Sequence, residues 1–337
     1  MDKKTFYFNG KLLNLKELNF KLKHDFSQVQ VFLNNFLSEN PFFETYTSGS
    51  TGSPKSIQLK KSDMIASAKM TMDYLKIPKK AKTLMCLPSD KIGGIMVLVR
   101  WLVGDLDLYI SKPKSNPLKE WDIQFDFCSM VPFQVQKSID DISKIKKLII
   151  GGAAIEPELE MDLAHVKIEA YHSYGMTETI SHIALRRVGT FEPFHALPNV
   201  SLEVDSNSCL IIEAPHLGVT KMKTNDIVEL KELNQFIWKG RLDNVVNSGG
   251  IKFFPEEIEK KIGRLDSEFF IIGIPDSKFG EKLVLIKEGE NRENLSIPML
   301  SKFEKPKEII HINEFQRTET GKIKRKETLN QLLKKGK

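Results

Sequence analysis

Apolar and polar positions along the chain follow helical spacing in some segments and alternate in others. Residues 26–37 have the spacing of an amphipathic helix, and a second helix is predicted to open at Ser62 and Asp63. Short apolar runs predict strands at 5–10, 83–87, 106–110, 125–130, 147–150 and 168–171. Because strands that alternate with helices are typical of layered α/β domains, we expect a large domain of that class.

The pattern changes in the last third of the chain. Short alternating strands with Gly, Asn and Pro between them predict a β-rich subdomain over about 194–240. Pro255 begins a further predicted helix; the other elements expected after it are strands at 269–274 and 282–287 and a helix at 326–333. We therefore expect an N-terminal domain over 1–242 and a small, mobile α+β domain over 243–337.

The composition is typical of a globular protein with reduced cysteines. The 337 residues are 41% hydrophobic and 28% charged, as in ordinary globular proteins. Cys86, Cys128 and Cys209 lie far apart without metal-ligand spacing, which favours buried thiols in a reduced, cytoplasmic protein. No signal peptide is visible at Met1, and the most apolar run, 92–103, is too short for stable membrane insertion.

Charge is concentrated at the C-terminal end. The net charge is +6, and basic residues cluster from Arg317 onward. No aromatic residue follows Phe315, so a platform for stacking bases is not indicated and nucleic acid is not an expected partner. A small polyanion is the partner that this charge favours.

Residues 47–55 form the most distinctive polar segment. They are Thr47, Ser48, Gly49, Ser50, Thr51, Gly52, Ser53, Pro54 and Lys55, between two strand-like runs. Glycines let backbone amides approach an anion, and the hydroxyls and the lysine add donors, so the segment suits a polyphosphate. A flexible connector is the alternative. A Walker loop is excluded, because Pro54 replaces its glycine and a strand-like run follows where a helix should begin.

Further polar motifs follow in a fixed order, most of them weak individually. They are Gly151-Gly152-Ala153-Ala154, Tyr174-Gly175-Met176-Thr177-Glu178, Thr224-Asn225-Asp226, Gly240-Arg241-Leu242-Asp243, Ser248-Gly249-Gly250 and Thr320-Gly321-Lys322. Together with residues 47–55, they closely resemble the adenylate-forming superfamily of acyl-CoA synthetases, luciferases and adenylation domains, over roughly residues 43–328. The resemblance implies the adenylate-forming α/β fold, with a truncated large N-terminal domain and a small C-terminal α+β domain.

The resemblance also implies a site for ATP and Mg²⁺. Thr47, Ser48, Gly49, Ser50, Thr51, Gly52 and Lys55 would grip the β- and γ-phosphates. Tyr174 and Gly175 would meet the adenine, beside the backbone of Gly151, Gly152 and Ala153. Asp226 would bind the ribose hydroxyls and Arg241 the ribose or a phosphate. Thr177 would touch the α-phosphate, Glu178 would hold Mg²⁺, and Lys322 would bridge the carboxylate and the α-phosphate. Without the resemblance, Glu178 could cap a helix, Asp226 could be a turn residue and Lys322 a solvated lysine.

Two segments narrow the substrate. Residues 87–96, followed by Arg100, and residues 244–252 look most like short forms of the 2-succinylbenzoate–CoA ligases of menaquinone biosynthesis. The resemblance implies a ligase that makes an acyl-adenylate from ATP and an acid, and then a thioester with coenzyme A. Another small aromatic or dicarboxylic acid remains an alternative, as do a carrier-protein thiol and a non-catalytic nucleotide-binding relative.

The acid itself predicts a cation in the pocket, because 2-succinylbenzoate has a second carboxylate besides the one that is activated. Arg100 is the candidate, with Ser173 and Ser248 as weaker ones; Arg100 could instead snorkel from an apolar helix. The resemblance further implies a hinge at Asp243 and movement of Ser248, Gly249 and Gly250 toward the thiol.

Three features of the sequence differ from the usual pattern of the superfamily. The phosphate segment begins at residue 47, so we expect a reduced N-terminal sheet whose edge a second subunit of a homo-oligomer could cover. Asn225 stands where the superfamily has glycine, and Ser89-Asp90 stand where an aromatic residue or a histidine is common.

Overall fold

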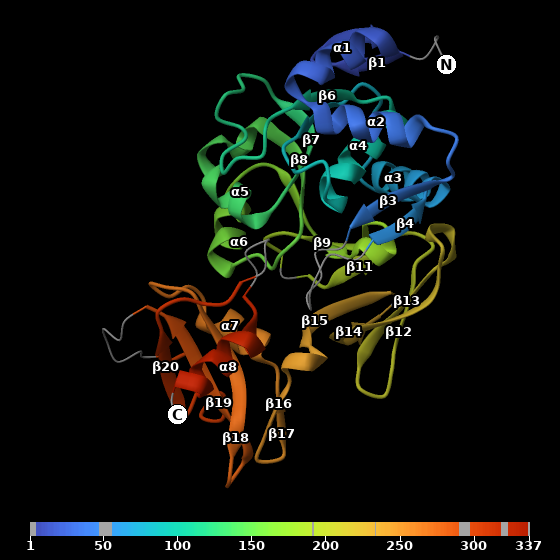
Figure 1. Ribbon diagram of the computed structural model, residues 1–337. Helices are drawn as coiled ribbons and strands as arrows, with labels where there is room; N and C mark the ends of the chain where they lie inside the picture. The colour runs from blue at the N-terminus through green and yellow to red at the C-terminus, as the bar shows by residue number, and fades with distance from the viewer. Residues whose placement is uncertain are drawn as a thin grey trace.

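The computed structural model describes residues 5–46, 56–190, 192–232, 234–289, 297–317 and 323–335. Figure 1 shows two lobes that follow one another along the chain. The large lobe (residues 5–241) is built on one long sheet, and the small lobe (residues 246–335) is built on a second. Within the described residues, no helix is long and apolar enough to cross a membrane.

The first sheet joins thirteen strands of the described chain, in the order β12-β13-β14-β15-β11-β10-β9-β8-β7-β5-β6-β1-β2. Pairing is parallel from β9 to β1 and antiparallel on both sides of that block. The bounds are β1 Thr5–Phe8, β2 Lys11–Asn14, β5 Lys82–Met85, β6 Asp107–Ile110, β7 Phe125–Met130, β8 Ile145–Ile150, β9 Glu169–Gly175, β10 His182–Arg187, β11 Phe194–Ala196, β12 Ser201–Val204, β13 Cys209–Ala214, β14 Val219–Lys231 and β15 Gln235–Arg241.

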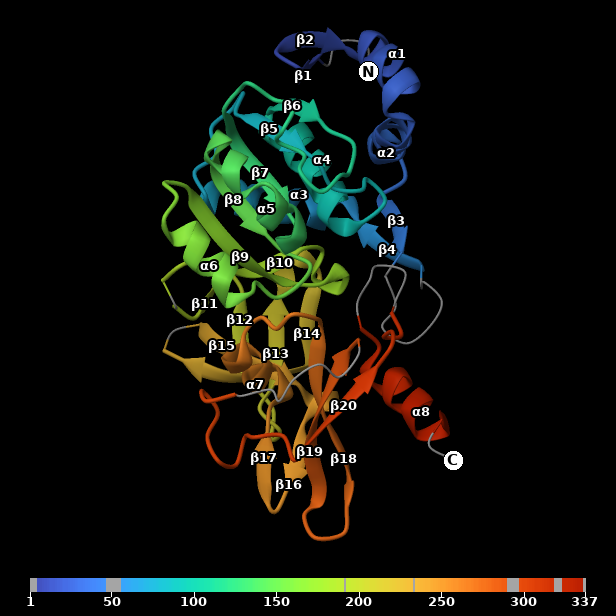
Figure 2. The ribbon, with the colours of Figure 1, turned by 90° about the vertical axis from the view of Figure 1, so that its left-hand side faces the viewer.

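Helices cover both faces of the parallel block, as Figures 1 and 2 show. The helices of the lobe are α1 Leu15–Asp25, α2 Ser27–Leu37, α3 Lys61–Tyr74, α4 Ile92–Gly104, α5 Pro132–Lys137 and α6 Pro157–Ala164. Residues of α1 to α4 share one hydrophobic core with Ile149, whereas Leu148 and Ile150 pack in a second core with α5 and α6. This alternation along β8 places the sheet between two helical layers, which confirms the expected α/β class.

The segment predicted to bind phosphate lies between two strands that the structure describes. Strands β3 Phe42–Tyr46 and β4 Ser56–Lys60 pair antiparallel, with Tyr46 opposite Ser56. Residues 47–55 themselves, with Thr47, Ser48, Gly49, Ser50, Thr51, Gly52 and Lys55, lie outside the described residues. Strands β12 to β15, predicted as a β-rich subdomain, extend the same sheet as the parallel block.

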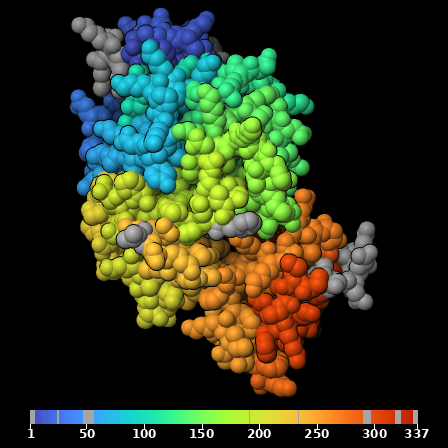
Figure 3. All heavy atoms as spheres, turned by 180° about the vertical axis from the view of Figure 1, so that it is seen from behind, coloured from blue at the N-terminus to red at the C-terminus, as the bar shows by residue number. Residues whose placement is uncertain are grey.

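The small lobe contains a separate sheet of five strands within the described residues. Its elements are β16 Val246–Ser248, β17 Ile251–Phe253, α7 Pro255–Ile262, β18 Phe269–Asp276, β19 Gly280–Glu288, β20 Glu308–Ile312 and α8 Arg325–Lys335. The chain enters this lobe through the short 3-10 turn η4, Leu242–Asn244, directly after β15. Figure 3 shows the small lobe below the large one, from behind. A domain boundary at 242/243 is therefore our proposal.

Candidate functional site

The carboxyl ends of β8 and β9 bring two of the predicted motifs side by side. Ile150 is opposite His172 in the parallel register, so Gly151 follows β8 where Ser173 and Tyr174 close β9. A Cβ on Gly151 would lie 2.5 Å from Ser173 Oγ, so glycine permits this close approach. Ser173 Oγ donates to the carbonyl of Ile150 at 3.1 Å. Ser173 thus bonds to the backbone beside the predicted adenine pocket.

The residue after Gly151 completes this loop. Gly152 has φ +88°, in the left-handed region that favours glycine. His172 Nε2 lies 3.2 Å from the carbonyl oxygen of Ala153, and a neutral His172 with its proton on Nε2 donates there. The other ring nitrogen, Nδ1, accepts from Arg186 at 3.3 Å, and Arg186 is paired with buried Glu160. This chain of contacts fixes the loop that carries Gly151, Gly152 and Ala153.

Asp226 on β14 is brought to Tyr174 by the sheet. The Tyr174 hydroxyl donates to Asp226 Oδ2 at 2.7 Å, and Trp238 Nε1 donates to Asp226 Oδ1 at 3.1 Å. Arg241 lies 3.7 Å from the same carboxylate. Burial, and then the charge of Asp226, raise the pKa of Tyr174 above its usual value. The phenol therefore remains a donor, and Asp226 keeps lone pairs for further hydrogen bonds.

Trp238 is a site residue that the sequence did not reveal. The register between β14 and β15 shifts between Ile227 and Val228, so Trp238 is opposite Val228 and not Glu229. This bulge puts Trp238 on the face that carries Asp226, because side chains alternate along a strand. Gly240, with φ +150°, is the one signal beside the extra residue of the bulge, but a glycine alone does not reveal which way the register shifts.

Thr177 and Glu178 lie in a tight turn that joins β9 to β10. The turn η2, Thr177–Thr179, leaves Glu178 exposed next to Tyr174 and Gly175. Ile180 follows with φ +66°, a strained conformation for a β-branched residue. Thr179 Oγ1 braces the turn, accepting from the Met176 amide at 3.0 Å and lying 2.6 Å from the carbonyl oxygen of Ser181. No hydrogen bond or ion pair joins the Glu178 carboxylate to another described side chain, and a single carboxylate fits Mg²⁺, which usually takes few protein ligands besides phosphate oxygens and water.

Arg100 lies in the interior of the large lobe, so the alternative that it snorkels to the surface is wrong. Its side chain projects from α4, and the residue is 2% exposed. Nη2 donates to Ser181 Oγ at 3.3 Å, and Nε is buried without a partner in the described part of the chain. No carboxylate of the described residues pairs with the guanidinium, and burial alone lowers the pKa of Arg100 to about 10. Such a buried cation is stabilised when an anion lies beside it.

The predicted motif of the small lobe, residues 248–250, does not lie near the ends of β8 and β9. Ser248, Gly249 and Gly250 form the tip between β16 and β17, which Figures 1 and 2 show at the end of the molecule away from β9. Asp243 lies nearer, 3.6 Å from Arg241 and 3.2 Å from Asn225, at the start of the small lobe. Ser248 is therefore separated from Arg100 in this arrangement of the lobes.

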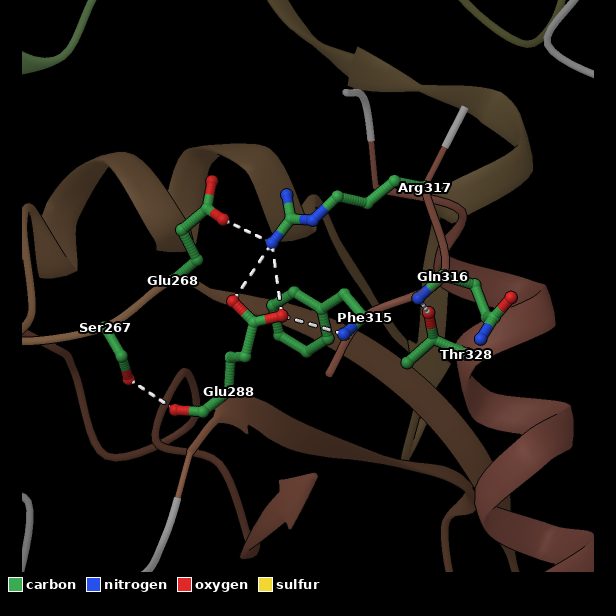
Figure 4. A network of polar contacts seen from close by, with 7 residues as sticks. All are labelled: Ser267, Glu268, Glu288, Phe315, Gln316, Arg317 and Thr328. Carbon is green, nitrogen blue, oxygen red and sulfur yellow. Dashed lines mark hydrogen bonds and ion pairs between the residues drawn. The ribbon is translucent and has the colours of Figure 1, made fainter. Parts of the chain in front are cut away.

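Lys322 lies outside the described residues, but the residues on both sides of its segment are anchored in the small lobe. Arg317 pairs with Glu268 at 2.5 Å and with Glu288 at 3.0 Å, and Figure 4 shows the three side chains together. On the other side, Arg325 pairs with Glu259 at 2.7 Å. The segment that carries Lys322 is thus attached at both ends to the small lobe.

Comparisons with known proteins agree with this fold. The AMP-binding enzyme family matches residues 4–216. The chain is 35% identical to a crystallised acyl-CoA synthetase (AMP-forming)/AMP-acid ligase II-like protein from Dyadobacter fermentans, covering 91% of this chain and 94% of that one, with a TM-score of 0.62. It also superimposes on O-succinylbenzoate coenzyme A synthetase from Bacillus subtilis in complex with ATP and magnesium, with a TM-score of 0.75 at 18% identity over 85% of this chain and 69% of that one.

Among curated proteins, the chain is 27% identical to 2-succinylbenzoate–CoA ligase of Haemophilus influenzae. The match covers 83% of this chain but 64% of that ligase, so the chain spans less than two thirds of that relative's length. The family match extends over more than half of the chain, and two of the predicted motifs, at Gly151 and Tyr174, lie at the neighbouring ends of β8 and β9. The chain therefore belongs to the AMP-binding enzyme family.

Proposed function

We propose that this protein is an ATP-dependent acid–CoA ligase whose acid is 2-succinylbenzoate, the substrate that would place it in menaquinone biosynthesis. The observation that carries the proposal is Arg100, a cation buried without an anionic partner among the described residues. It lies against Ser181, three residues after Glu178, so an acid held there would have its other end near the nucleotide. A long-chain fatty acid would place an apolar chain against this cation, which costs free energy.

The reaction follows from the charges. A carboxylate oxygen of the acid attacks the α-phosphorus of ATP, the bond to the bridging oxygen breaks, and pyrophosphate leaves. Mg²⁺ held by Glu178 and the ammonium of Lys322 would neutralise the charge that develops on the phosphate, while Thr177 would donate to the α-phosphate. The thiol of coenzyme A then attacks the acyl carbon, loses its proton, and AMP departs.

The nucleotide would be held by the groups gathered at the strand ends. Tyr174 would present its ring to adenine beside the backbone of Gly151, Gly152 and Ala153, with Gly175 next to it. Asp226 would accept from the ribose hydroxyls, oriented by the donors Tyr174 and Trp238. Residues 47–52 and Lys55 would hold the β- and γ-phosphates.

The two half-reactions would use different arrangements of the lobes. Lys322 would be carried by the small lobe, to which its flanking residues Arg317 and Arg325 are paired. Rotation about Asp243 would withdraw Lys322 and bring Ser248, Gly249 and Gly250 toward the thiol.

The test is exchange of labelled pyrophosphate into ATP, measured with purified protein, Mg²⁺ and a panel of single acids. We expect 2-succinylbenzoate to give the strongest exchange, and product analysis to find its CoA thioester when coenzyme A is added. Exchange with a fatty acid but not with 2-succinylbenzoate would contradict the assignment.

Another small aromatic or dicarboxylic acid is the second candidate, since Arg100 would pair with any second carboxylate of suitable reach. Transfer to a carrier-protein thiol is the alternative for the second step. The acid panel decides the first alternative, and thioester formation with free coenzyme A decides the second.

A further inference from the structure

Three elements of the large lobe meet at the Arg100 guanidinium. Thr71 comes from α3, and Ser181 and His182 come from the junction of η2 and β10. Arg100 Nη2 donates to Ser181 Oγ at 3.3 Å and to Thr71 Oγ1 at 3.5 Å. His182 contacts both hydroxyls, with Nε2 3.1 Å from Thr71 Oγ1 and Nδ1 3.2 Å from Ser181 Oγ. The four side chains thus close a ring of hydrogen bonds.

The direction of each hydrogen bond follows from the donors available. Arg100 can only donate, so both hydroxyl oxygens accept from it. The Thr71 hydroxyl lies 3.0 Å from the Ser67 carbonyl and donates there, which leaves Thr71 Oγ1 to accept a proton from His182 Nε2. His182 Nδ1 then accepts from the Ser181 hydroxyl. Every hydrogen bond is formed when His182 is neutral and its proton is on Nε2.

The surroundings of His182 agree with the neutral form. The side chain is buried, and burial together with the neighbouring Arg100 lowers its pKa well below 6.5. Protonation of His182 would place a donor at Nδ1, where the Ser181 hydroxyl needs an acceptor. It would also place a second positive charge beside Arg100.

We infer that His182 is a positioning residue for recognition of the acid. Through Thr71 and Ser181, it holds the Arg100 guanidinium so that Nε is left to bind the second carboxylate of the acid. The inference rests on the proposed function, in which Arg100 meets that carboxylate. Thr71 and Ser181 engage Nη2 alone, and Nε is buried without a partner in the described chain. The sequence offered no signal for this set, because its members come from segments about 110 residues apart.

The kinetic test compares His182→Leu, which removes both ring nitrogens, with His182→Gln, which keeps one donor and one acceptor. We expect His182→Leu to raise the apparent KM for 2-succinylbenzoate in pyrophosphate exchange about tenfold, since the guanidinium loses its orientation. The KM for ATP should stay unchanged, and His182→Gln should recover most of the affinity for the acid. His216→Leu is the control, because His216 also contacts α3 but faces Met70.

Monocarboxylic analogues separate positioning from a general loss of structure. 4-Oxo-4-phenylbutanoate has only the chain carboxylate of 2-succinylbenzoate, and 2-butanoylbenzoate has only the ring carboxylate. The analogue that supports exchange is the one that keeps the activated carboxylate and lacks the second. We expect its KM to be the same in wild type and in His182→Leu. An equal rise for both acids, or no rise for 2-succinylbenzoate, overturns the inference; Thr71→Val replaces His182→Leu if that variant does not fold.

The protonation state of His182 can be measured without any substrate, so this test does not depend on the proposed function. In protein labelled with ¹⁵N-histidine, we expect the His182 signals, assigned by their loss in His182→Gln, to be those of a neutral ring protonated on Nε2. Ser181→Ala should shift the Nδ1 signal. A ring protonated on Nδ1 contradicts the arrangement even if exchange succeeds. Failure of every dicarboxylic acid in exchange, with these signals found, would contradict the proposed function and leave the hydrogen-bonded ring established.

Discussion

At the scale of single residues, we expect Arg100 to have opposite effects on the stability of the protein and on binding of the proposed acid. A buried cation that has no carboxylate partner among the described residues lowers the free energy of unfolding when no anion is bound. We expect Arg100→Met to raise the free energy of unfolding by about 1–3 kcal/mol, because a flexible apolar side chain fits the site without an unpaired charge. Denaturant unfolding of both proteins, without ligands, measures this difference.

The same substitution should weaken binding of the acid. Loss of a charge-assisted pair costs about 2–3 kcal/mol, or roughly 30- to 150-fold in KM for 2-succinylbenzoate. Arg187→Met on β10 is the control, since Arg187 donates to the Ile168 carbonyl and not to this site. A variant that is both less stable and unchanged in KM would contradict the role of Arg100.

His172 makes the free energy of unfolding depend on pH in the acid range. Burial, and then the charge of Arg186, lower its pKa from 6.5 to about 4, so below pH 6.5 the unfolded chain binds a proton that the folded protein does not. The free energy of unfolding therefore falls as the pH drops from 6.5 toward 4. We expect His172→Gln to reduce this fall by at most about 2 kcal/mol between pH 6.5 and 5. Urea unfolding at several pH values measures it, and parallel curves for the two proteins would contradict it.

Candidate site residues that stand in a short motif could be named from the sequence, whereas the residues that contact them in the structure could not. Gly151, Gly152, Tyr174 and Asp226 stand in motifs whose order is visible along the chain. Trp238 reaches Asp226 only through a β-bulge, and His182 reaches Arg100 only through packing of α3 against β10. Such contacts depend on register and packing over long sequence separations, which local patterns do not encode.

At the scale of elements, the strands predicted for the parallel block agree with the structure, whereas α1 is a helix that the sequence analysis did not predict. α1 was not expected, because its buried residues Leu18 and Leu22 make a narrow stripe while Phe20 is 69% exposed. Its N-terminus is nevertheless well specified by a capping box between Asn14 and Glu17. Elements with broad apolar faces, such as α2, could be predicted.

The contact between β15 and α7 joins the two lobes. Lys239 on β15 pairs with Glu257 on α7 at 2.8 Å, and Asn244 donates to Glu256 at 2.5 Å. We expect Lys239→Met to weaken this lobe arrangement by about 0.5–1 kcal/mol, since partly exposed ion pairs contribute that much. Energy transfer between dyes on one introduced surface cysteine per lobe should report a two- to fivefold smaller population of this arrangement.

A matched variant separates this effect from a change of surface charge. Lys221 lies near Glu203 at 3.4 Å, and both residues belong to the large lobe. Lys221→Met should leave the distance between the dyes unchanged. Equal distance distributions in wild type and Lys239→Met would show that this pair does not hold the lobes.

At the scale of the whole molecule, the chain passes from one lobe to the other through one short turn. Asp243 lies in η4, where 3-10 φ values near −60° are compatible with proline. We expect Asp243→Pro to fold, to restrict rotation about this residue, and to slow one half-reaction at least tenfold relative to the other. Single-turnover measurement of adenylate formation and of thioester formation from supplied adenylate tests this. Equal rates in variant and wild type for both steps would contradict a hinge at Asp243.

The positions of the three cysteines have a chemical consequence. Cys86, Cys128 and Cys209 are all buried and unpaired. An acyl phosphate anhydride is a strong acylating agent, and sulfur is the nucleophile in a protein most prone to intercept it. In the proposed reaction, these sulfur atoms would be shielded in the core, so self-acylation of the protein would be suppressed and the activated acyl group would be reserved for a thiol that arrives from solution.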